Sequence, residues 1–366
     1  MSKENLNPNL EEEIEGLGAD EDASLGDYPI DTLLIRTETR TVHDVLRRIE
    51  KETFVMDPDF QRDFIWPDDK QSKLIESVLM RIPLPVFYLA EDDKGRNVVV
   101  DGLQRLSTFQ YFVKDKLKLK LPNQRELNKK LFSELSPKLQ NRVEDCNLVL
   151  YIIDSKVPEQ ARLDIFERVN GGVPLTRQQM RNCLFMGKAT RLLKTEAKAK
   201  LFSEATGGSL RASTMRDREF VNRFCAFKIF PFGEYKGEMD EFLAQALRKM
   251  NSLSDEQLKE FSNQFRTSLV NNYKVFGRYA FRKHYDGSGG QRNVINASIW
   301  DVMTTGLSDY PEDIVEKRKE KLKAAFFKLM EDAEFIKSIT YGTNSVKAVK
   351  CRFEMAGEMI GEVFGA

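Results

Sequence analysis

The sequence predicts an α+β first half followed by a mostly α-helical second half. Short runs of β-branched and aromatic residues, such as VFYLA at 86–90 and LVLYIID at 148–154, occur before about residue 190. Beyond that point the apolar residues recur at helical spacing, as in DEFLAQALRKM at 240–250. With 366 residues, of which 41% are hydrophobic, the chain is long enough to form two domains.

The first hundred residues predict alternating helices and strands. The segment 41–51 has apolar residues at helical spacing and begins with Thr41, a residue type that caps helices. Pro67 is expected at the first position of a second helix that ends near Met80. VFYLA and the valines at 98–100 then predict two strands joined by a hairpin at EDDKGRN.

The remaining elements of the first half follow from the same periodicities. A helix is expected after residue 102, and further helices at 123–145, 158–169 and 176–187, with Thr176 as the cap of the last one. The polar, glycine-bearing segment 195–213 indicates that a boundary is near. We therefore expect a tail, a mixed domain and a helical domain, at 1–27, 28–190 and 191–366.

The net charge of zero hides an asymmetry between the start of the chain and the rest. Residues 1–27 contain nine acidic residues and one basic residue, so they carry −8 and residues 28–366 carry +8. Such an acidic segment without aromatic residues predicts a disordered tail. Its role is either to add solubility or to compete with an anion for a basic groove.

Composition excludes several classes of protein. No run of 18 apolar residues predicts a membrane span, and no secretory signal is expected, so the sequence predicts a cytoplasmic protein that does not enter membranes. The four cysteines are far apart, which favours free thiols over disulfides, and no metal site is expected. Common nucleotide, zinc-protease and serine-hydrolase motifs are missing. The two histidines, His43 and His284, are interpreted as surface or capping residues.

The stretch VVVDGLQRLSTF at 98–109 is the first candidate site. A strand that ends in Asp101-Gly102 and feeds a helix leaves backbone N–H groups available for an anion such as phosphate. Arg105 adds a planar cation suited to phosphate, and Gln104 could orient a water or a base edge. Asp101 has two readings: it caps the helix, or it binds a divalent cation or activates water.

Two other stretches combine arginine with aromatic residues or glycine. PDFQRDFIWP at 58–67 is either an extended segment with aromatics in the core or a surface where arginine and aromatic rings contact nucleic acid or a nucleotide. FERVNGGVPLTRQQMRN at 166–182 has a glycine-rich turn flanked by arginines, which fits a helix-turn-helix reader or an anion pocket.

Taken together and in this order, the three stretches resemble the family once called domain of unknown function 262. This family is now described as the N-terminal domain of GmrSD-type restriction endonucleases, and it also occurs in SspE-like phage-defence proteins. The likeness is strongest over 41–190. Leu103 departs from the family pattern, because the usual motif reads DGQQR where this chain has DGLQR.

The resemblance implies a ParB/sulfiredoxin-like fold with a small mixed sheet, in which the DGQQR-type turn holds the phosphates of a nucleoside triphosphate with Mg²⁺. It assigns Asp101, Gln104 and Arg105 to catalysis. The nucleotide-binding and stacking residues that we expect from the motifs and their flanks are Gln61, Arg62, Gly102, Asn170, Gly171, Gly172, Arg181 and Asn182, with Phe64 and Trp66 stacking on a base.

Three functions are consistent with these residues. The first is a sensor subunit of a bacterial antiphage restriction system that binds and hydrolyses nucleoside triphosphates and gates DNA cleavage by a partner nuclease. The second is a DNA-binding or DNA-nicking module that uses the same pocket, and the third is a non-catalytic scaffold. An HNH nuclease needs histidine, and none follows His284 in this sequence. Homo-oligomerisation stays open.

Overall fold

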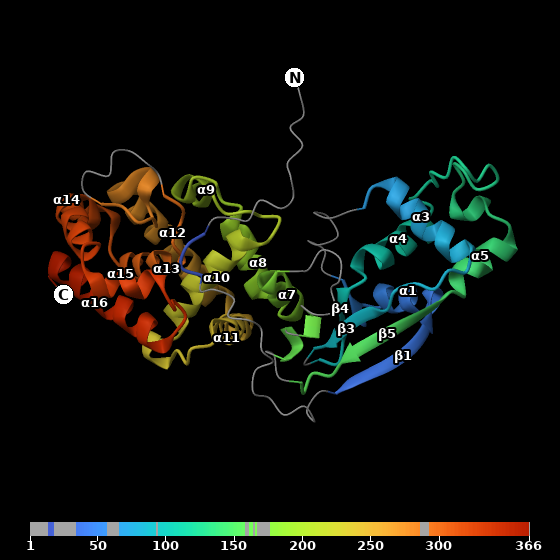
Figure 1. Ribbon diagram of the computed structural model, residues 1–366, viewed down its shortest axis with the longest axis horizontal. Helices are drawn as coiled ribbons and strands as arrows, with labels where there is room; N and C mark the ends of the chain where they lie inside the picture. The colour runs from blue at the N-terminus through green and yellow to red at the C-terminus, as the bar shows by residue number, and fades with distance from the viewer. Residues whose placement is uncertain are drawn as a thin grey trace, which may run out of the picture. The chain divides into compact units, whose positions relative to one another are not determined.

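The chain forms two compact units in a computed structural model, which describes residues 14–17, 34–56, 66–92, 94–157, 161–163, 165–166, 176–285 and 293–365 (Figure 1). One unit comprises Leu25–Leu184, and the other comprises Phe185–Ala366 with the first part of the chain. The first contains a sheet and helices and the second is helical, which confirms the predicted fold class. Within the described residues, no helix is both long enough and apolar enough to cross a membrane.

The first unit, called the sheet unit below, is built on a mixed sheet with the strand order β1-β5-β3-β4-β2 (Figure 1). β5 pairs antiparallel to β1 and parallel to β3, and β3 and β4 form the predicted antiparallel hairpin. The strands are β1 Ile35–Thr41, β2 Phe54–Val55, β3 Phe87–Glu91, β4 Asn97–Asp101 and β5 Asn147–Ile153. The valines of β4 are buried, so this strand lies in the core of the unit.

The helices of the sheet unit are α1 Val42–Glu50, α3 Asp68–Leu79, α4 Leu103–Val113, the short η2 Phe132–Glu134, α5 Pro137–Glu144 and α7 Arg177–Leu184. Thr41 caps α1 as predicted, because its side chain accepts a hydrogen bond from the Asp44 N–H. Pro67 is the N-cap of α3 and not its first residue, so the helix begins at Asp68, one residue later than predicted. The helix expected over 123–145 was wrong in its first part, where a series of turns brings the backbone of Lys129 and Lys130 to Leu119.

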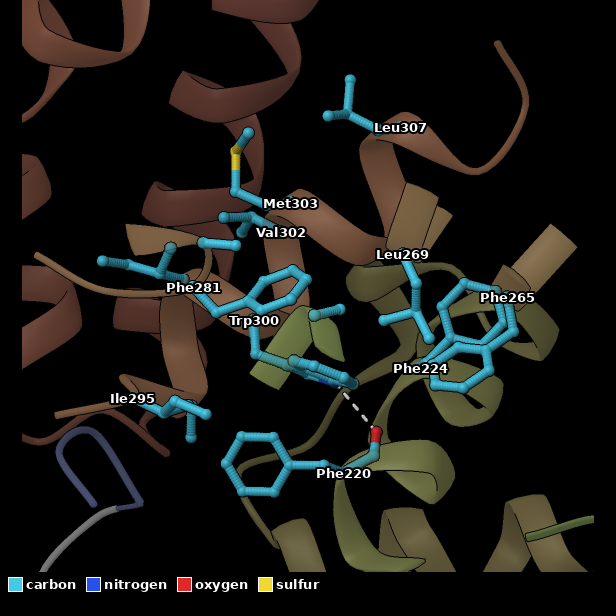
Figure 2. Close-up of a cluster of buried hydrophobic side chains, with 14 of the residues drawn as sticks. Phe220, Phe224, Phe265, Leu269, Phe281, Ile295, Trp300, Val302, Met303 and Leu307 are labelled. Carbon is cyan, nitrogen blue, oxygen red and sulfur yellow. Dashed lines mark hydrogen bonds between the residues drawn. The ribbon is translucent and has the colours of Figure 1, made fainter. Parts of the chain in front are cut away.

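The second unit, called the helical unit below, contains α8 Lys188–Ala197, α9 Lys200–Thr206, α10 Arg216–Ile229, η3 Phe232–Glu234, α11 Met239–Ser252, α12 Asp255–Phe276, η4 Gly277–Tyr279, α13 Ala297–Leu307, α14 Glu312–Leu329, α15 Ala333–Thr340 and α16 Val346–Phe364. Aromatic side chains from several of these helices gather around Trp300 of α13 (Figure 2). The Trp300 indole donates to the Phe220 carbonyl over 2.9 Å, so the buried ring keeps a polar partner.

The core of the helical unit also contains an ion cluster that joins three helices. Asp301 of α13 accepts two hydrogen bonds from Arg223 of α10, at 2.8 and 2.6 Å, and one from Arg352 of α16, at 3.1 Å. All three side chains are at most 1% exposed. Burial lowers the pKa of Arg352 to about 10, and the neighbouring Asp301 carboxylate opposes that shift.

Four residues of the segment expected to be a disordered tail, 14–17, lie against the helical unit. The Glu15 N–H donates to the Ile295 carbonyl, and the Ala297 N–H donates to the Glu15 carbonyl. Ile14 and Leu17 pack against the core of the helical unit, and Lys283 pairs with Glu15. These four residues therefore differ from the expectation, because two apolar side chains and an ion pair hold them in place; the rest of 1–27 lies outside the described residues.

Candidate functional site

The predicted strand-to-helix turn lies at the carboxyl end of β4. Asp101 is the last residue of β4, and Gly102 is the N-cap of α4 with φ of 94°. A Cβ atom on Gly102 would lie 2.1 Å from Cδ1 of Phe87, the first residue of β3. Both the left-handed backbone and the lack of space therefore require glycine at this turn.

The Arg105 guanidinium connects this turn, through hydrogen bonds, to the backbone that leads into β3. It donates to the Pro85 carbonyl, to the Val86 carbonyl at 3.0 Å and to the Asp101 carboxylate at 2.6 Å. Its carbon lies 4.1 Å from the centre of the Phe87 ring, a cation–π distance. Burial lowers the pKa of Arg105, and the Asp101 carboxylate opposes that shift. The guanidinium thus faces protein acceptors and holds the Asp101 side chain in a fixed position.

Asp101 keeps access to solvent although Arg105 binds it. Its side chain is 32% exposed, whereas the Arg105 side chain is 10% exposed. Its Oδ2 atom accepts the Arg105 hydrogen bond. A carboxylate that is both positioned and accessible is the form in which Asp can bind a cation or accept a proton.

Two tyrosines that sequence reasoning missed lie in register with Asp101. Tyr88 of β3 is paired with Asp101 of β4 and with Tyr151 of β5, so the three side chains form a row across three strands. The Tyr88 and Tyr151 ring centres are 5.4 Å apart. Burial raises the pKa of Tyr88, and the nearby Tyr151 and Asp101 raise it further. Only the strand register could have revealed this row, because the three residues are far apart in the sequence.

Gln104 connects the turn to the first motif. Its side-chain oxygen accepts a hydrogen bond from the Trp66 N–H at 3.0 Å, and Gln71 donates to the Trp66 carbonyl at 2.6 Å. Lys70 lies over the Trp66 ring, 4.3 Å from its centre. The structure thus brings Trp66 to the Asp101 turn. The other candidates of this motif, Gln61, Arg62 and Phe64, lie outside the described residues.

The third motif contributes α7, which packs against β4, the strand that ends in Asp101. Thr176 caps this helix as predicted, since it accepts from the Gln179 N–H at 3.2 Å. Arg181 and Asn182 are 1% and 2% exposed, and Arg181 donates to Gln178 at 3.0 Å.

These two candidates therefore lie inside the unit, next to the strand that supports the turn. Asn170, Gly171 and Gly172, and with them the turn of a helix-turn-helix, lie outside the described residues.

The comparisons with known proteins identify the segment that contains all three motifs. Residues 42–186 match the family model of the GmrSD restriction endonuclease, N-terminal domain. This segment is therefore similar to a GmrSD N-terminal domain, and we call it the GmrSD domain below. The resemblance seen in the sequence is thereby confirmed for this part of the chain, which runs from α1 to the end of α7. No curated protein and no solved structure matches the chain.

The described residues of the GmrSD domain bring together Asp101, Gly102, Gln104, Arg105 and Trp66. Within that described part, no cluster of three or more His, Cys, Asp or Glu side chains could hold a metal ion by itself. A Mg²⁺ ion that arrives with a nucleotide needs fewer protein ligands, because it is often bound by one or two carboxylates together with phosphate oxygens.

Proposed function

We propose that this chain is a sensor subunit of a restriction system, in which the GmrSD domain binds and hydrolyses a nucleoside triphosphate and gates DNA cleavage by a partner. The family match to a restriction endonuclease supports the restriction system. The observation that carries the nucleotide site is the Asp101 carboxylate, 32% exposed and held by Arg105 at the start of α4. A positioned and accessible carboxylate is one of the groups that can act as a general base in hydrolysis.

The start of α4 supplies the phosphate-binding groups. The first hydrogen bond within the helix runs from the Leu106 N–H to the Gly102 carbonyl, so the N–H groups of Leu103, Gln104 and Arg105 have no acceptor inside the helix. They and the helix dipole favour an anion at this end. The Asp101 carboxylate alone would repel phosphate; Asp101 would help to hold a Mg²⁺ ion that arrives with the nucleotide, and the charge of that ion would offset the repulsion.

Gln104 and Arg105 have different parts in this proposal. Trp66 fixes the Gln104 side chain through its oxygen, and among the described residues no acceptor bonds to its Nε2 group. Gln104 would therefore donate to a phosphate oxygen or to a water. Arg105 acts as a positioning residue, since its donors hold Asp101 and the Pro85–Val86 backbone. Leu103 is 8% exposed and contributes packing where the family motif has glutamine.

A separate partner would supply the nuclease. His284 stacks on Tyr279 with ring centres 4.2 Å apart and meets Phe327 edge-on. His43 lies in α1 of the sheet unit. His284 therefore has an aromatic packing role in this structure. In our proposal a partner subunit cuts DNA when this chain binds or hydrolyses its nucleotide.

The test compares nucleotide binding and hydrolysis by the full chain and by Asp101→Asn. Thermal unfolding is measured with each of the four nucleoside triphosphates, with and without Mg²⁺, and phosphate release is measured in parallel. A nucleotide at one hundred times its Kd stabilises the folded state by about 2.7 kcal/mol, which gives a clear rise in Tm. Asp101→Asn should remove the Mg²⁺-dependent part of that rise and lower phosphate release at least about 100-fold.

Asp313→Asn is the matched control, because Asp313 is an exposed carboxylate in the first turn of α14. It should leave both the rise in Tm and phosphate release unchanged. The proposal is wrong if no nucleotide raises the Tm of the full chain in either condition, or if Asp313→Asn and Asp101→Asn have equal effects.

A further inference from the structure

The segment 114–130 of the sheet unit concentrates positive charge. It contains seven basic residues and two acidic residues, a net charge of +5, in a chain whose total formal charge is zero. The basic residues are Lys114, Lys116, Lys118, Lys120, Arg125, Lys129 and Lys130. This concentration is local, because the remainder of the chain must carry the opposite charge.

Lysine and leucine alternate over 116–121, and the structure separates them onto two sides. Leu117, Leu119 and Leu121 are 3%, 0% and 4% exposed. Lys116, Lys118 and Lys120 between them are all exposed. Alternate residues of an extended chain are roughly 6.6 Å apart and point the same way. The three ammonium groups therefore form a row above a buried leucine edge, which we call the lysine ribbon.

Backbone hydrogen bonds hold the lysine ribbon in place. Leu119 donates to the Lys130 carbonyl at 3.0 Å and accepts from the Lys129 N–H at 2.7 Å, which brings these two lysines beside the row. The Lys120 N–H donates to the Ser72 hydroxyl of α3 at 2.8 Å. Because the backbone is fixed on both sides, the points from which the lysine side chains extend are set before any ligand arrives, and the flexible side chains can adjust to it.

Most of this charge is not neutralised within the protein. Lys120 pairs with Asp68 at 2.7 Å, and Lys114 pairs with Glu50 at 2.9 Å. Among the described residues, no carboxylate lies within ion-pair distance of Lys116, Lys118 or Lys130. A polyanion can therefore bind them without first breaking an ion pair.

We propose that the lysine ribbon binds the phosphate backbone of duplex DNA, at a surface separate from the Asp101 turn. The choice of DNA rests on the proposed function in a restriction system. The row has the regular spacing that suits successive phosphates of one strand. Lysine supplies point charges without the planar fork that reads a base edge. The contact is therefore independent of base sequence and depends strongly on salt.

The test measures binding of the full chain to a fluorescent duplex of random sequence at several salt concentrations. The triple variant Lys116→Gln, Lys118→Gln, Lys130→Gln should bind at least about 10-fold more weakly at low salt. The slope of log affinity against log salt should become shallower by about 2 to 3, because each lost phosphate contact contributes about 0.9. A triple variant that binds like the unmodified chain would overturn the proposal.

A matched control removes the same charge from the helical unit. Lys317, Lys319 and Lys350 are surface lysines that pair with glutamate or aspartate within their own helices. Changing these three to glutamine should leave affinity and salt slope unchanged, and an equal loss would overturn the assignment to the ribbon. Polyglutamate of equal charge should bind much more weakly than the duplex, and equal binding would overturn the assignment to a phosphate backbone.

Nucleotide-dependent stabilisation is measured on the same ribbon variant. If the triple variant changes only the lysine ribbon, it should keep the nucleotide-dependent rise in Tm while it loses affinity for DNA. A chain that binds duplex through the ribbon but responds to no nucleotide refutes the proposed nucleotide site and leaves the DNA surface standing. The two proposals can therefore fail separately.

Discussion

Each unit of the protein buries arginine against an aspartate, and the two arrangements differ in what they leave accessible. In the helical unit, both oxygens of Asp301 accept from arginine, and its side chain is 0% exposed. In the sheet unit, Asp101 accepts from Arg105 through one oxygen and is 32% exposed. The first cluster can only join helices, whereas the second positions a carboxylate that a ligand can still reach. Burial of the carboxylate, more than the presence of the ion pair, separates a structural cluster from a candidate site.

The largest effect is expected for Asp301→Ala. It would leave Arg223 and Arg352 buried without their carboxylate, and breaking a buried pair in this way costs about 3 to 5 kcal/mol. For a unit of this size the Tm of the helical unit should fall by roughly 6 to 20 °C, measured by thermal unfolding.

Asp309→Ala serves as the control for this prediction. Asp309 pairs with Lys228 at 2.8 Å, but its side chain is 59% exposed, so the loss should stay below about 1 kcal/mol. Equal losses for the two variants would show that burial does not distinguish the clusters.

The second effect concerns the turn that separates Asp101 from Arg105. Gly102→Ala places a Cβ atom against the Phe87 ring at a backbone φ of 94°. Strain and overpacking together should destabilise the sheet unit by about 2 to 4 kcal/mol, seen as a lower midpoint in urea unfolding.

Gly233→Ala is the matched control, because a Cβ atom there meets nothing within 4 Å and the backbone is not left-handed. It should leave stability within about 0.5 kcal/mol of the unmodified chain. If Gly102→Ala were equally harmless, the close packing of the turn on β3 would be refuted.

The two clusters also show what could be predicted from the sequence. The strand, the glycine turn and the helix around Asp101 were predictable, because capping, glycine and periodicity act within a few residues. The partners of Arg105 were not, since the Pro85 and Val86 carbonyls come from a segment 20 and 19 residues away and require the packed hairpin. Asp301 was missed altogether, because its arginines lie 78 and 51 positions away and only the helix packing joins them.

A third carboxylate extends the comparison to the protein surface and gives the smallest effect. Asp44 accepts from Arg40 at 2.8 Å, from Arg47 at 2.7 Å and from Arg48 at 3.1 Å, and its side chain is 23% exposed. The hydrogen bond from Arg47 is the largest cause that holds the pKa of Asp44 well below its usual range, with Arg40 and Arg48 adding to it against the opposing effect of burial.

The sign of the resulting pH dependence follows from the direction of the Asp44 shift. Because the pKa is lower in the folded state, the carboxylate stabilises the fold above its unfolded pKa of about 3.9, and this contribution is lost as the pH falls below that value. Asp44→Asn should therefore cost up to about 1 kcal/mol at pH 7, and the difference from the unmodified chain should shrink between about pH 5 and pH 2. Unfolding free energies of both chains across this range measure it. A difference that stays constant with pH would mean that the ion pairs between Asp44 and the three arginines do not stabilise the fold.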